Sequence, residues 1–208
     1  MYIQSIKHMQ YLPDMQTLVQ MFDKQPVIKQ NGRNYLIIPL FNHSVATHPA
    51  TLHMAANAVI DSVDWQKNQI DTIVSEEETG GFLAVCVAIQ RNIPFTLAKQ
   101  NPVHLPGEIA IEFSMAYNDK MTLHLNGVKK GDKVVIVEDF VDTGGTMIAL
   151  IQALQKAGAQ IVDIVALGEK VNMGGVRKIQ QETGFLVKTV IKVDTTGDTS
   201  AVIGTMFD

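Results

Sequence analysis

The amino-acid sequence predicts a single α/β domain with a parallel, twisted sheet covered by helices on both faces. Residues 134–137 form a continuous aliphatic run rather than an alternating one, which is typical of a strand buried on both faces of a parallel sheet. Segments with helical spacing alternate with such runs over most of the chain. The length of 208 residues suits one domain, and a hydrophobic content of 46% is enough for a substantial core.

The N-terminal part of the chain predicts a helix followed by a β-hairpin, together called the hood below. Apolar residues recur at helical spacing within residues 3–22. Residues 27–29 and 35–38 are rich in β-forming side chains and flank Asn31 and Gly32, a pair typical of tight hairpin turns. The predicted hood, core and tail of the one domain are residues 1–40, 41–193 and 194–208.

The core continues the alternation of helices and strands. Pro49 opens a helix whose predicted buried face consists of Leu52, Ala55, Ala56, Val59, Ile60 and Val63. The further predicted strands are residues 70–74, 94–97, 134–137, 161–167 and 185–193, and the further predicted helices are residues 81–90, 146–157 and 175–182. Residues 99–120 are polar and contain Pro102, Pro106 and Gly107, and a connection of this length predicts a flexible lid loop.

Composition excludes several classes of protein. The net charge is −4 and there is no long basic run, which argues against nucleic acid as the main partner. The one cysteine, Cys86, lies among apolar neighbours, so we expect a buried structural thiol in a reducing compartment. The first ten residues resemble neither a signal peptide nor a membrane span. A cytoplasmic protein is the expectation.

The chemistry is expected where two strands end, because ligands of parallel sheets bind at the carboxyl ends of the strands. Residues 75–81 follow one strand and residues 138–146 follow another. In the second segment, Gly144 and Gly145 allow backbone N–H groups to approach an anion, and the helix that follows adds further N–H donors. With the hydroxyl groups of Thr143 and Thr146, these groups predict a socket for a phosphate monoester.

Two acidic residues precede this socket. Glu138 and Asp139 would repel a phosphate, so their use is to accept hydrogen bonds from sugar hydroxyls or to help hold a divalent cation. A phosphate socket with two carboxylates just upstream therefore suits a ribose 5-phosphate. The alternative is an ordinary strand end followed by a helix that Asp142 caps.

The sequence VVIVEDFVDTGGT, residues 134–146, resembles the signature of type I phosphoribosyltransferases, which use phosphoribosyl pyrophosphate. Residues 105–113 are similar to the flexible loop of adenine-type and archaeal hypoxanthine-type enzymes. Residues 25–39 are similar to the hairpin of archaeal purine enzymes, and residues 168–175 to the base-side segment of xanthine-type members. The resemblance extends over residues 25–193, and it implies the purine branch of the family.

This resemblance implies that ribose 5-phosphate is transferred to a purine, with adenine or hypoxanthine favoured, to give a nucleoside monophosphate and pyrophosphate. It assigns the 5-phosphate to Asp142, Thr143, Gly144, Gly145 and Thr146, and the ribose hydroxyls to Glu138 and Asp139. Asp142 is also the candidate for accepting a proton from the purine imidazole ring. Helix capping is an equally weighted alternative for Asp142.

The resemblance also implies the remaining contacts. Pyrophosphate would lie over Glu78, Thr79, Gly80 and Gly81, with Mg²⁺ bridging its oxygens. Lys99 would contact phosphoribosyl pyrophosphate, or it is a solvated lysine at a strand end. Lys170 would donate to a purine exocyclic oxygen or ring nitrogen, or plays no such part. Family members form homodimers, so a homodimer is expected.

Other candidates are weaker. Phe113 and Tyr117 lie in the predicted lid, where they would stack on the base or simply pack. His43, His48 and His53 lack the spacing of metal ligands, so no protein metal site is predicted.

Two loops depart from the adenine-type pattern. Gly80 occupies the place of an arginine, and Ala98-Lys99-Gln100 occupies the place of Arg-Lys-Arg. The three arginines of the chain, Arg33, Arg91 and Arg177, lie elsewhere, so the bidentate contacts that arginine makes with pyrophosphate are lost. Three consecutive glutamates, residues 76–78, would either recruit metal or repel pyrophosphate.

These departures keep a second class open, a non-catalytic regulatory protein that binds phosphoribosyl pyrophosphate or a nucleotide. A regulator of this kind carries a basic N-terminal module for DNA, whereas the first 24 residues contain only Lys7 and Lys24 as cations. The enzyme is therefore favoured over the regulator. A pyrimidine-type transferase is disfavoured by the hairpin and lid resemblances.

Overall fold

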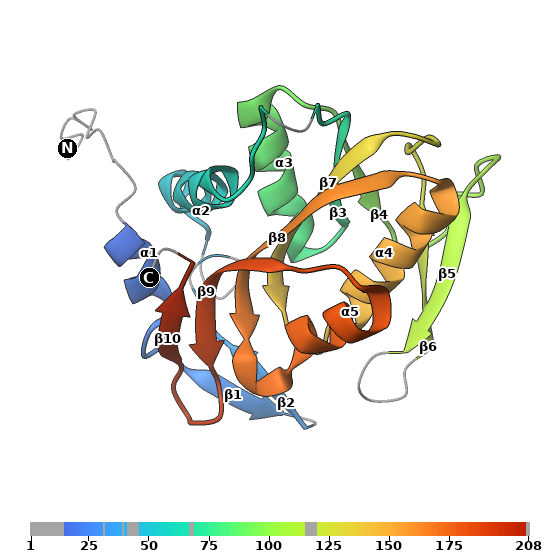
Figure 1. Ribbon diagram of the computed structural model, residues 1–208. Helices are drawn as coiled ribbons and strands as arrows, with labels where there is room; N and C mark the ends of the chain where they lie inside the picture. The colour runs from blue at the N-terminus through green and yellow to red at the C-terminus, as the bar shows by residue number, and fades with distance from the viewer. Residues whose placement is uncertain are drawn as a thin grey trace, which may run out of the picture.

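A six-stranded sheet forms the centre of the computed structural model, which describes residues 15–30, 32–38, 40, 46–66, 69–114 and 120–206 (Figure 1). The strand order is β10-β9-β8-β7-β3-β4, and all neighbours are parallel except β10, which is antiparallel to β9. The strands are β3 (Thr72–Glu76), β4 (Phe95–Ala98), β7 (Lys133–Val141), β8 (Gln160–Lys170), β9 (Lys188–Asp194) and β10 (Ala201–Thr205). The predicted α/β class is confirmed.

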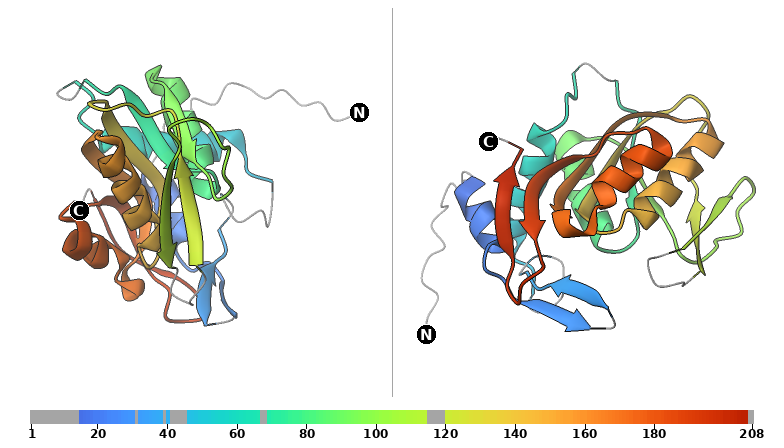
Figure 2. Two further views of the ribbon diagram at one scale, coloured as in Figure 1. Left: turned by 90° about the vertical axis from the view of Figure 1, so that its right-hand side faces the viewer. Right: turned by 60° about the horizontal axis from the view of Figure 1, so that its bottom comes forward.

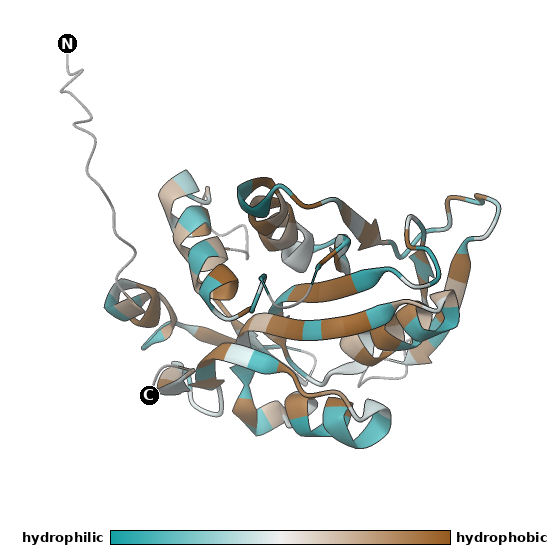
Figure 3. Cartoon of the chain, turned by 45° about the horizontal axis from the view of Figure 1, so that its top comes forward, coloured by the Kyte–Doolittle hydropathy of each residue, from teal (hydrophilic) through white to brown (hydrophobic). Residues whose placement is uncertain are grey.

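Helices cover both faces of this sheet (Figures 1 and 2). The helices are α1 (Met15–Phe22), α2 (Pro49–Asp61), α3 (Thr79–Arg91), α4 (Gly145–Ala157) and α5 (Gly175–Thr183). Val135 and Val137 of β7 share one hydrophobic cluster with α1, α2 and α3. Val134 and Ile136 share another with α4, which is why the strand reads as a continuous aliphatic run. Burying each such side chain contributes about 1.5–3 kcal/mol, and Figure 3 shows hydrophobic residues along the central strands.

Local signals set the helix ends. Pro49 is the first residue of α2, and Nδ1 of His48 accepts a hydrogen bond from the N–H of Ala50 at 3.2 Å. Gly158 ends α4 in the left-handed conformation, with φ 75°, directly after residue 157, where the helix was predicted to end. Several boundaries differ from prediction. α3 begins two residues earlier than residue 81, and β9 begins three residues after residue 185. β7 extends four residues beyond residue 137, and β8 extends three residues beyond residue 167. No described helix is long and apolar enough to cross a membrane.

The hood is an antiparallel hairpin of β1 (Val27–Gln30) and β2 (Arg33–Leu36), and Figures 1 and 2 show it beside the carboxyl ends of β8 and β9. Gly32 has φ 74°, as a tight turn requires. Asn31, the other predicted turn residue, lies outside the described residues, as does the predicted helical segment before Met15.

The predicted lid is more regular than expected. Within residues 99–120 the chain forms β5 (Ile109–Ser114), which pairs with β6 (Lys120–Leu125) in an antiparallel hairpin. Ile109, Ile111 and Phe113 alternate with more exposed residues and pack against the cluster around α4. Apolar side chains at every second position favour a strand with one buried face, despite the prolines and polar residues before it. The prediction that this whole segment is a loop was therefore wrong. Its movement as a lid stays a prediction.

Two further predictions need correction. The predicted tail, residues 194–208, contains β10, which extends the sheet beyond β9. The turn before β10 also holds the hood, because the N–H of Lys24 donates to the carbonyl of Ser200 at 2.9 Å. Cys86 is half-buried rather than buried, and burial raises the pKa of its thiol.

Candidate active site

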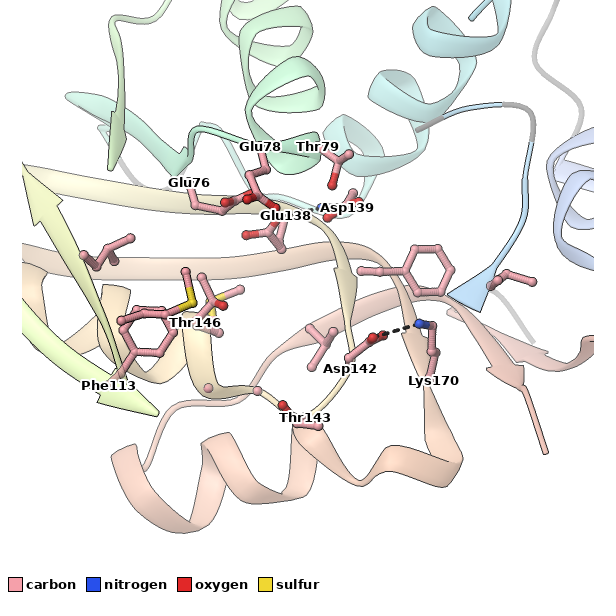
Figure 4. Close-up of a pocket in the computed structure, with 18 of the residues that line it drawn as sticks. Glu76, Glu78, Thr79, Phe113, Glu138, Asp139, Asp142, Thr143, Thr146 and Lys170 are labelled. Atoms are coloured by element: carbon pink, nitrogen blue, oxygen red, sulfur yellow. Dashed lines mark hydrogen bonds and ion pairs between the residues drawn. The ribbon is translucent and has the colours of Figure 1, made fainter. Parts of the chain in front are cut away.

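A cavity of about 300 Å³ lies at the carboxyl ends of β3 and β7, between the hood and the β5–β6 hairpin. Its wall combines a glycine-rich loop, acidic residues, a lysine and apolar side chains (Figure 4). The lining residues are Tyr35, Leu36, Ile38, Glu76, Glu78, Thr79, Gln100, Phe113, Met121, Leu123, Glu138, Asp139, Phe140, Val141, Asp142, Thr143, Gly144, Gly145, Thr146, Met147 and Lys170. The two segments predicted to meet at one edge of the sheet therefore do so.

The loop of residues 142–146 connects β7 to α4, and all five of its residues line the cavity. Gly144 has φ 80°, a left-handed conformation that favours glycine. The loop is held from behind by α5, because a methyl group on Gly144 would lie 2.9 Å from the carbonyl oxygen of Gly175. A loop shaped in this way, at the start of a 13-residue helix, presents N–H groups and the positive end of the helix dipole to an anion.

The acidic pair has two different environments. Glu138 is 6% exposed, and its Oε1 accepts a hydrogen bond from the N–H of Asp139 at 3.0 Å. Burial raises the pKa of Glu138 well above its usual value, and the negative charges of Asp139 and Glu76 add to the shift. Asp139 is half-buried and faces the cavity, so it is the better placed of the two to accept hydrogen bonds from a ligand.

Gly80 makes room for the Glu138 carboxyl. A methyl group on Gly80 would lie 1.8 Å from Oε1 of Glu138 and 2.8 Å from Oγ of Ser75. The glycine that stands in place of a family arginine therefore lies directly against the buried acid.

Lys170, the last residue of β8, joins three parts of the chain. Its Nζ donates to Oδ2 of Asp142 at 2.8 Å and to the carbonyl oxygen of Asn34 in the hood at 2.9 Å. Lys170 is 8% exposed, whereas the Asp142 side chain is 49% exposed. Asp142 is therefore an ion-pair partner at the mouth of the loop, and the structure gives it no hydrogen bond that caps α4.

The structure does not bring all predicted residues to the cavity. Glu78 and Thr79 line it, but Gly80 and Gly81 are buried in the first turn of α3 and are not lining residues. Lys99 is exposed and does not line the cavity, and its backbone instead pairs with that of His124.

Of the weaker candidates, only some lie at the cavity. Phe113 lines the cavity, whereas Tyr117 and His43 lie outside the described residues. His48 caps α2 and His53 is exposed. Among the described residues, no group of three His, Cys, Asp or Glu side chains is arranged to hold a metal ion.

Sequence reasoning missed several lining residues. Tyr35, Leu36 and Ile38 come from the hood, and Gln100 follows β4, so only the tertiary fold brings them to the cavity. Glu76 was named only as one of three consecutive glutamates, although its position as the last residue of β3 could have assigned it to the lining.

A parallel sheet with a glycine loop at a helix start and an acidic pair after the same strand is the arrangement expected of a protein that binds a sugar phosphate. The model of the phosphoribosyl transferase domain matches residues 44–192, and the chain belongs to this family. The chain is 38% identical to a hypoxanthine/guanine phosphoribosyltransferase of Methanocaldococcus infernus over 85% of this chain and 94% of that protein. It is 37% identical to the enzyme of the same name from Methanococcus voltae, over 86% and 92%.

Solved structures share the fold. The adenine phosphoribosyltransferase of Thermoanaerobacter pseudethanolicus has a TM-score of 0.71 at 21% identity, covering 86% of this chain and 99% of that one. The adenine phosphoribosyltransferase of Rhodothermus marinus has a TM-score of 0.70 at 24% identity, covering 86% and 97%. These likenesses confirm the type I phosphoribosyltransferase fold.

Proposed function

We propose that this purine phosphoribosyltransferase transfers ribose 5-phosphate from phosphoribosyl pyrophosphate to a 6-oxopurine, hypoxanthine or guanine, in purine salvage. The observation that carries the proposal is one cavity that contains both the anion-binding loop of residues 142–146 and the buried cation Lys170. A 6-oxopurine presents an exocyclic oxygen, which accepts a hydrogen bond from an ammonium group, whereas adenine presents an amino group, which does not. The names of the similar archaeal proteins support the same choice.

In the proposed reaction, the loop of residues 142–146 holds the 5-phosphate and Asp139 accepts hydrogen bonds from the ribose hydroxyls. The bond from a purine ring nitrogen to C1 of the ribose forms as the bond from C1 to the pyrophosphate oxygen breaks. The proton on the ring nitrogen passes to the carboxylate of Asp142. Lys170 donates a hydrogen bond to the exocyclic oxygen of the base. Its Nζ lies 2.8 Å from Oδ2 of Asp142, so both groups face the same end of the cavity.

Mg²⁺ fits this site as an ion that arrives with the substrate. The wall beside the start of α3 carries Glu76 and Glu78, and Lys170 is the one basic residue among the described lining residues. Such a wall repels free pyrophosphate and accepts pyrophosphate whose charge a cation has partly neutralised. When bound, Mg²⁺ supplies charge neutralisation to the leaving group.

The test is a product assay with phosphoribosyl pyrophosphate, Mg²⁺ and each of hypoxanthine, guanine, xanthine and adenine. We expect monophosphate from hypoxanthine and guanine, with adenine a poor substrate. Turnover of adenine alone would contradict the choice of base. Binding of phosphoribosyl pyrophosphate with no turnover of any base would favour the regulatory protein instead.

We also infer a homodimer in the cytoplasm. Ile89 of α3 and Phe95 of β4 are large apolar side chains with 72% and 45% of their surface exposed, and a second copy of the chain would cover them. A monomeric mass in sedimentation or light scattering would contradict the dimer.

A further inference from the structure

Asn34 of the hood hairpin is bound to the chain around the central sheet through both its backbone and its side chain. Its carbonyl oxygen accepts a hydrogen bond from Nζ of Lys170 at 2.9 Å. Its side-chain Nδ2 donates to the carbonyl oxygen of Thr195 at 2.8 Å. Asn34 does not line the cavity itself, but the next two residues, Tyr35 and Leu36, do. The side chain of Asn34 therefore holds the part of the hairpin that borders the ligand.

Thr195, which directly follows β9, extends this attachment to the segment that carries Lys170. Thr195 is fully buried, and both its backbone N–H and its Oγ1 donate to Oδ1 of Asn172 at 3.0 Å. Asn172 lies in the short 3₁₀ helix Val171–Met173, directly after Lys170. The hydrogen bonds thus form a closed circuit, which runs from the hairpin to Thr195, on to Asn172, along the backbone to Lys170 and back to the hairpin.

Lys170 and Thr195 are the buried members of this circuit, with 8% and 0% of their surface exposed. A buried polar group that loses its partner still bears the cost of desolvation, so buried hydrogen bonds specify one arrangement of the segments that they join. The circuit therefore holds β2, the end of β8 and the end of β9 in one arrangement around the ammonium group of Lys170.

The ammonium group of Lys170 has three N–H donors. Among the described residues, its hydrogen-bond partners are the carbonyl oxygen of Asn34 and, at 2.8 Å, Oδ2 of Asp142 (Figure 4). One donor is thus available to a ligand in the cavity, which Lys170 lines. Because the ammonium group is tetrahedral, two engaged donors also determine the direction of the third.

We propose that Asn34 is a positioning residue for base selection. Its side chain, bound to Thr195, keeps its own carbonyl oxygen against Lys170 and thereby directs the third N–H at the exocyclic oxygen of a 6-oxopurine. Without the Asn34 amide the carbonyl oxygen can shift, and the ammonium group turns with it. A turned ammonium group still balances the charge of Asp142, but it distinguishes an exocyclic oxygen from an amino group less sharply. The proposal rests on the proposed function, which places a 6-oxopurine beside Lys170.

The base of the hairpin is held separately, so loss of the Asn34 side chain does not detach the hood. The N–H of Val27 donates to the carbonyl oxygen of Asp198 at 2.9 Å, and the N–H of Lys24 donates to that of Ser200 at 2.9 Å. These are backbone hydrogen bonds, which a side-chain substitution at Asn34 leaves in place. The expected change is therefore local to the end of the hairpin that borders the cavity.

Lys29 provides a matched control. It is the cross-strand partner of Asn34 in the hairpin, and its Nζ lies 3.0 Å from Oδ1 of Asp198 in the turn before β10. Both side chains thus join the same hairpin to the chain between β9 and β10. The ion pair of Lys29 is exposed, however, and neither of its partners lines the cavity. An exposed pair contributes little to stability, so its loss should leave the protein folded.

The variants are Asn34→Ala and Lys29→Ala. Steady-state kinetics with saturating phosphoribosyl pyrophosphate and Mg²⁺ compare hypoxanthine with adenine, and calorimetry measures the affinity for ribose 5-phosphate. For Asn34→Ala we expect KM for hypoxanthine to rise about three- to tenfold, the scale of one hydrogen bond, and the ratio of kcat/KM for hypoxanthine to that for adenine to fall by the same factor. The affinity for ribose 5-phosphate and all values for Lys29→Ala should stay unchanged. An unchanged ratio in Asn34→Ala, an equal fall in both variants, or an equal loss of ribose 5-phosphate affinity would overturn the proposal.

If Asn34→Ala does not fold, Thr195 decides the question. Thr195→Val removes the hydroxyl group that donates to Asn172 and keeps a similar shape, whereas Thr195→Ser keeps the hydroxyl group. We expect the ratio of bases to fall in Thr195→Val and to be retained in Thr195→Ser, and an equal ratio in the two variants overturns the role of the circuit. Failure of the unchanged protein to convert either base overturns the proposed function itself. Preference for hypoxanthine that none of these variants alters overturns only the role of Asn34.

Discussion

Gly175 packs against the loop of residues 142–146 but does not line the cavity. Replacing it with alanine therefore moves the loop while all groups that face the cavity keep their chemistry. A methyl group at this first residue of α5 would lie 2.2 Å from the carbonyl oxygen of Asp142 and 2.9 Å from the nitrogen of Gly144. Contacts of such a carbon under 3.0 Å essentially do not occur, so the 2.2 Å contact alone requires a shift of at least about 0.8 Å (3.0 − 2.2). Both atoms belong to the backbone, so a rotamer change cannot absorb the shift.

The substitution is expected to lower both the free energy of unfolding and the catalytic rate. Overpacking of this kind lowers the free energy of unfolding by about 1–3 kcal/mol, and the better helix propensity of alanine returns at most about 1 kcal/mol. Misplacement of a substrate-binding group by about 1 Å reduces the rate by roughly 100-fold. We therefore expect Gly175→Ala to remain folded, to bind ribose 5-phosphate more weakly and to lose roughly two orders of magnitude in kcat/KM.

The assay combines calorimetry with ribose 5-phosphate and the steady-state formation of nucleoside monophosphate. Gly174→Ala is the control, because a methyl group there has nothing within 4 Å, although its φ of 70° strains any other residue. This control should lose about 1–2 kcal/mol of stability and no ligand affinity. A folded Gly175→Ala with unchanged affinity for ribose 5-phosphate would refute the reasoning.

Three further predictions concern single side chains. Lys170→Gln should reduce the ratio of kcat/KM for hypoxanthine to that for adenine by about tenfold or more, because an amide can turn its oxygen toward an amino group. Asp139→Ala should weaken binding of a nucleoside monophosphate, measured by calorimetry, by roughly 1–3 kcal/mol, the scale of removing a charged hydrogen-bond acceptor. Glu76→Gln should be more stable than the unchanged protein at pH 8 by about 1–3 kcal/mol in urea unfolding, and the difference should disappear near pH 4.5.

The sign of the last prediction follows from the raised pKa. Burial raises the pKa of Glu76 in the folded protein to about 7 from its usual value of 4.5, so between these values the folded state binds more protons and stability falls as pH rises. A stability difference that does not change with pH would contradict this account. An unchanged ratio of bases in Lys170→Gln would remove the lysine from base selection, and an unchanged dissociation constant in Asp139→Ala would remove that residue from ribose binding.

Local patterns predicted the parts of the fold that local physics determines. The aliphatic runs of β7 and β8, the proline at the start of α2 and Gly158 after α4 each act within a few residues, and the structure confirms them. The β10 strand was missed because its five residues pair with β9 at the edge of the sheet and need no strong hydrophobic pattern. The β5 strand did carry the alternating pattern, but the neighbouring prolines were given more weight.

The site also contains some features that local sequence determines and others that only the tertiary fold brings together. The loop of residues 142–146 is continuous in sequence, so its composition was sufficient to place it at the cavity, and its binding of phosphate stays a prediction. The contact between Lys170 and Asn34 joins residues 136 positions apart, and no spacing rule connects them. The side chain of Lys99 was assigned to the site from resemblance alone, and the fold leaves it exposed outside the cavity.

Because Lys170 contacts the hood, the two ends of the cavity are built from different parts of the chain. The sugar-phosphate end of the cavity is one uninterrupted segment, while the end beside Lys170 is assembled from the hood hairpin, β7 and β8. If the purine lies beside Lys170 as proposed, an exchange of the hairpin between family members should alter base preference and leave binding of the 5-phosphate unchanged. Laboratory evolution of new base preferences in this scaffold should accordingly begin with residues 34–38 of the hairpin, which lie outside the loop of residues 142–146.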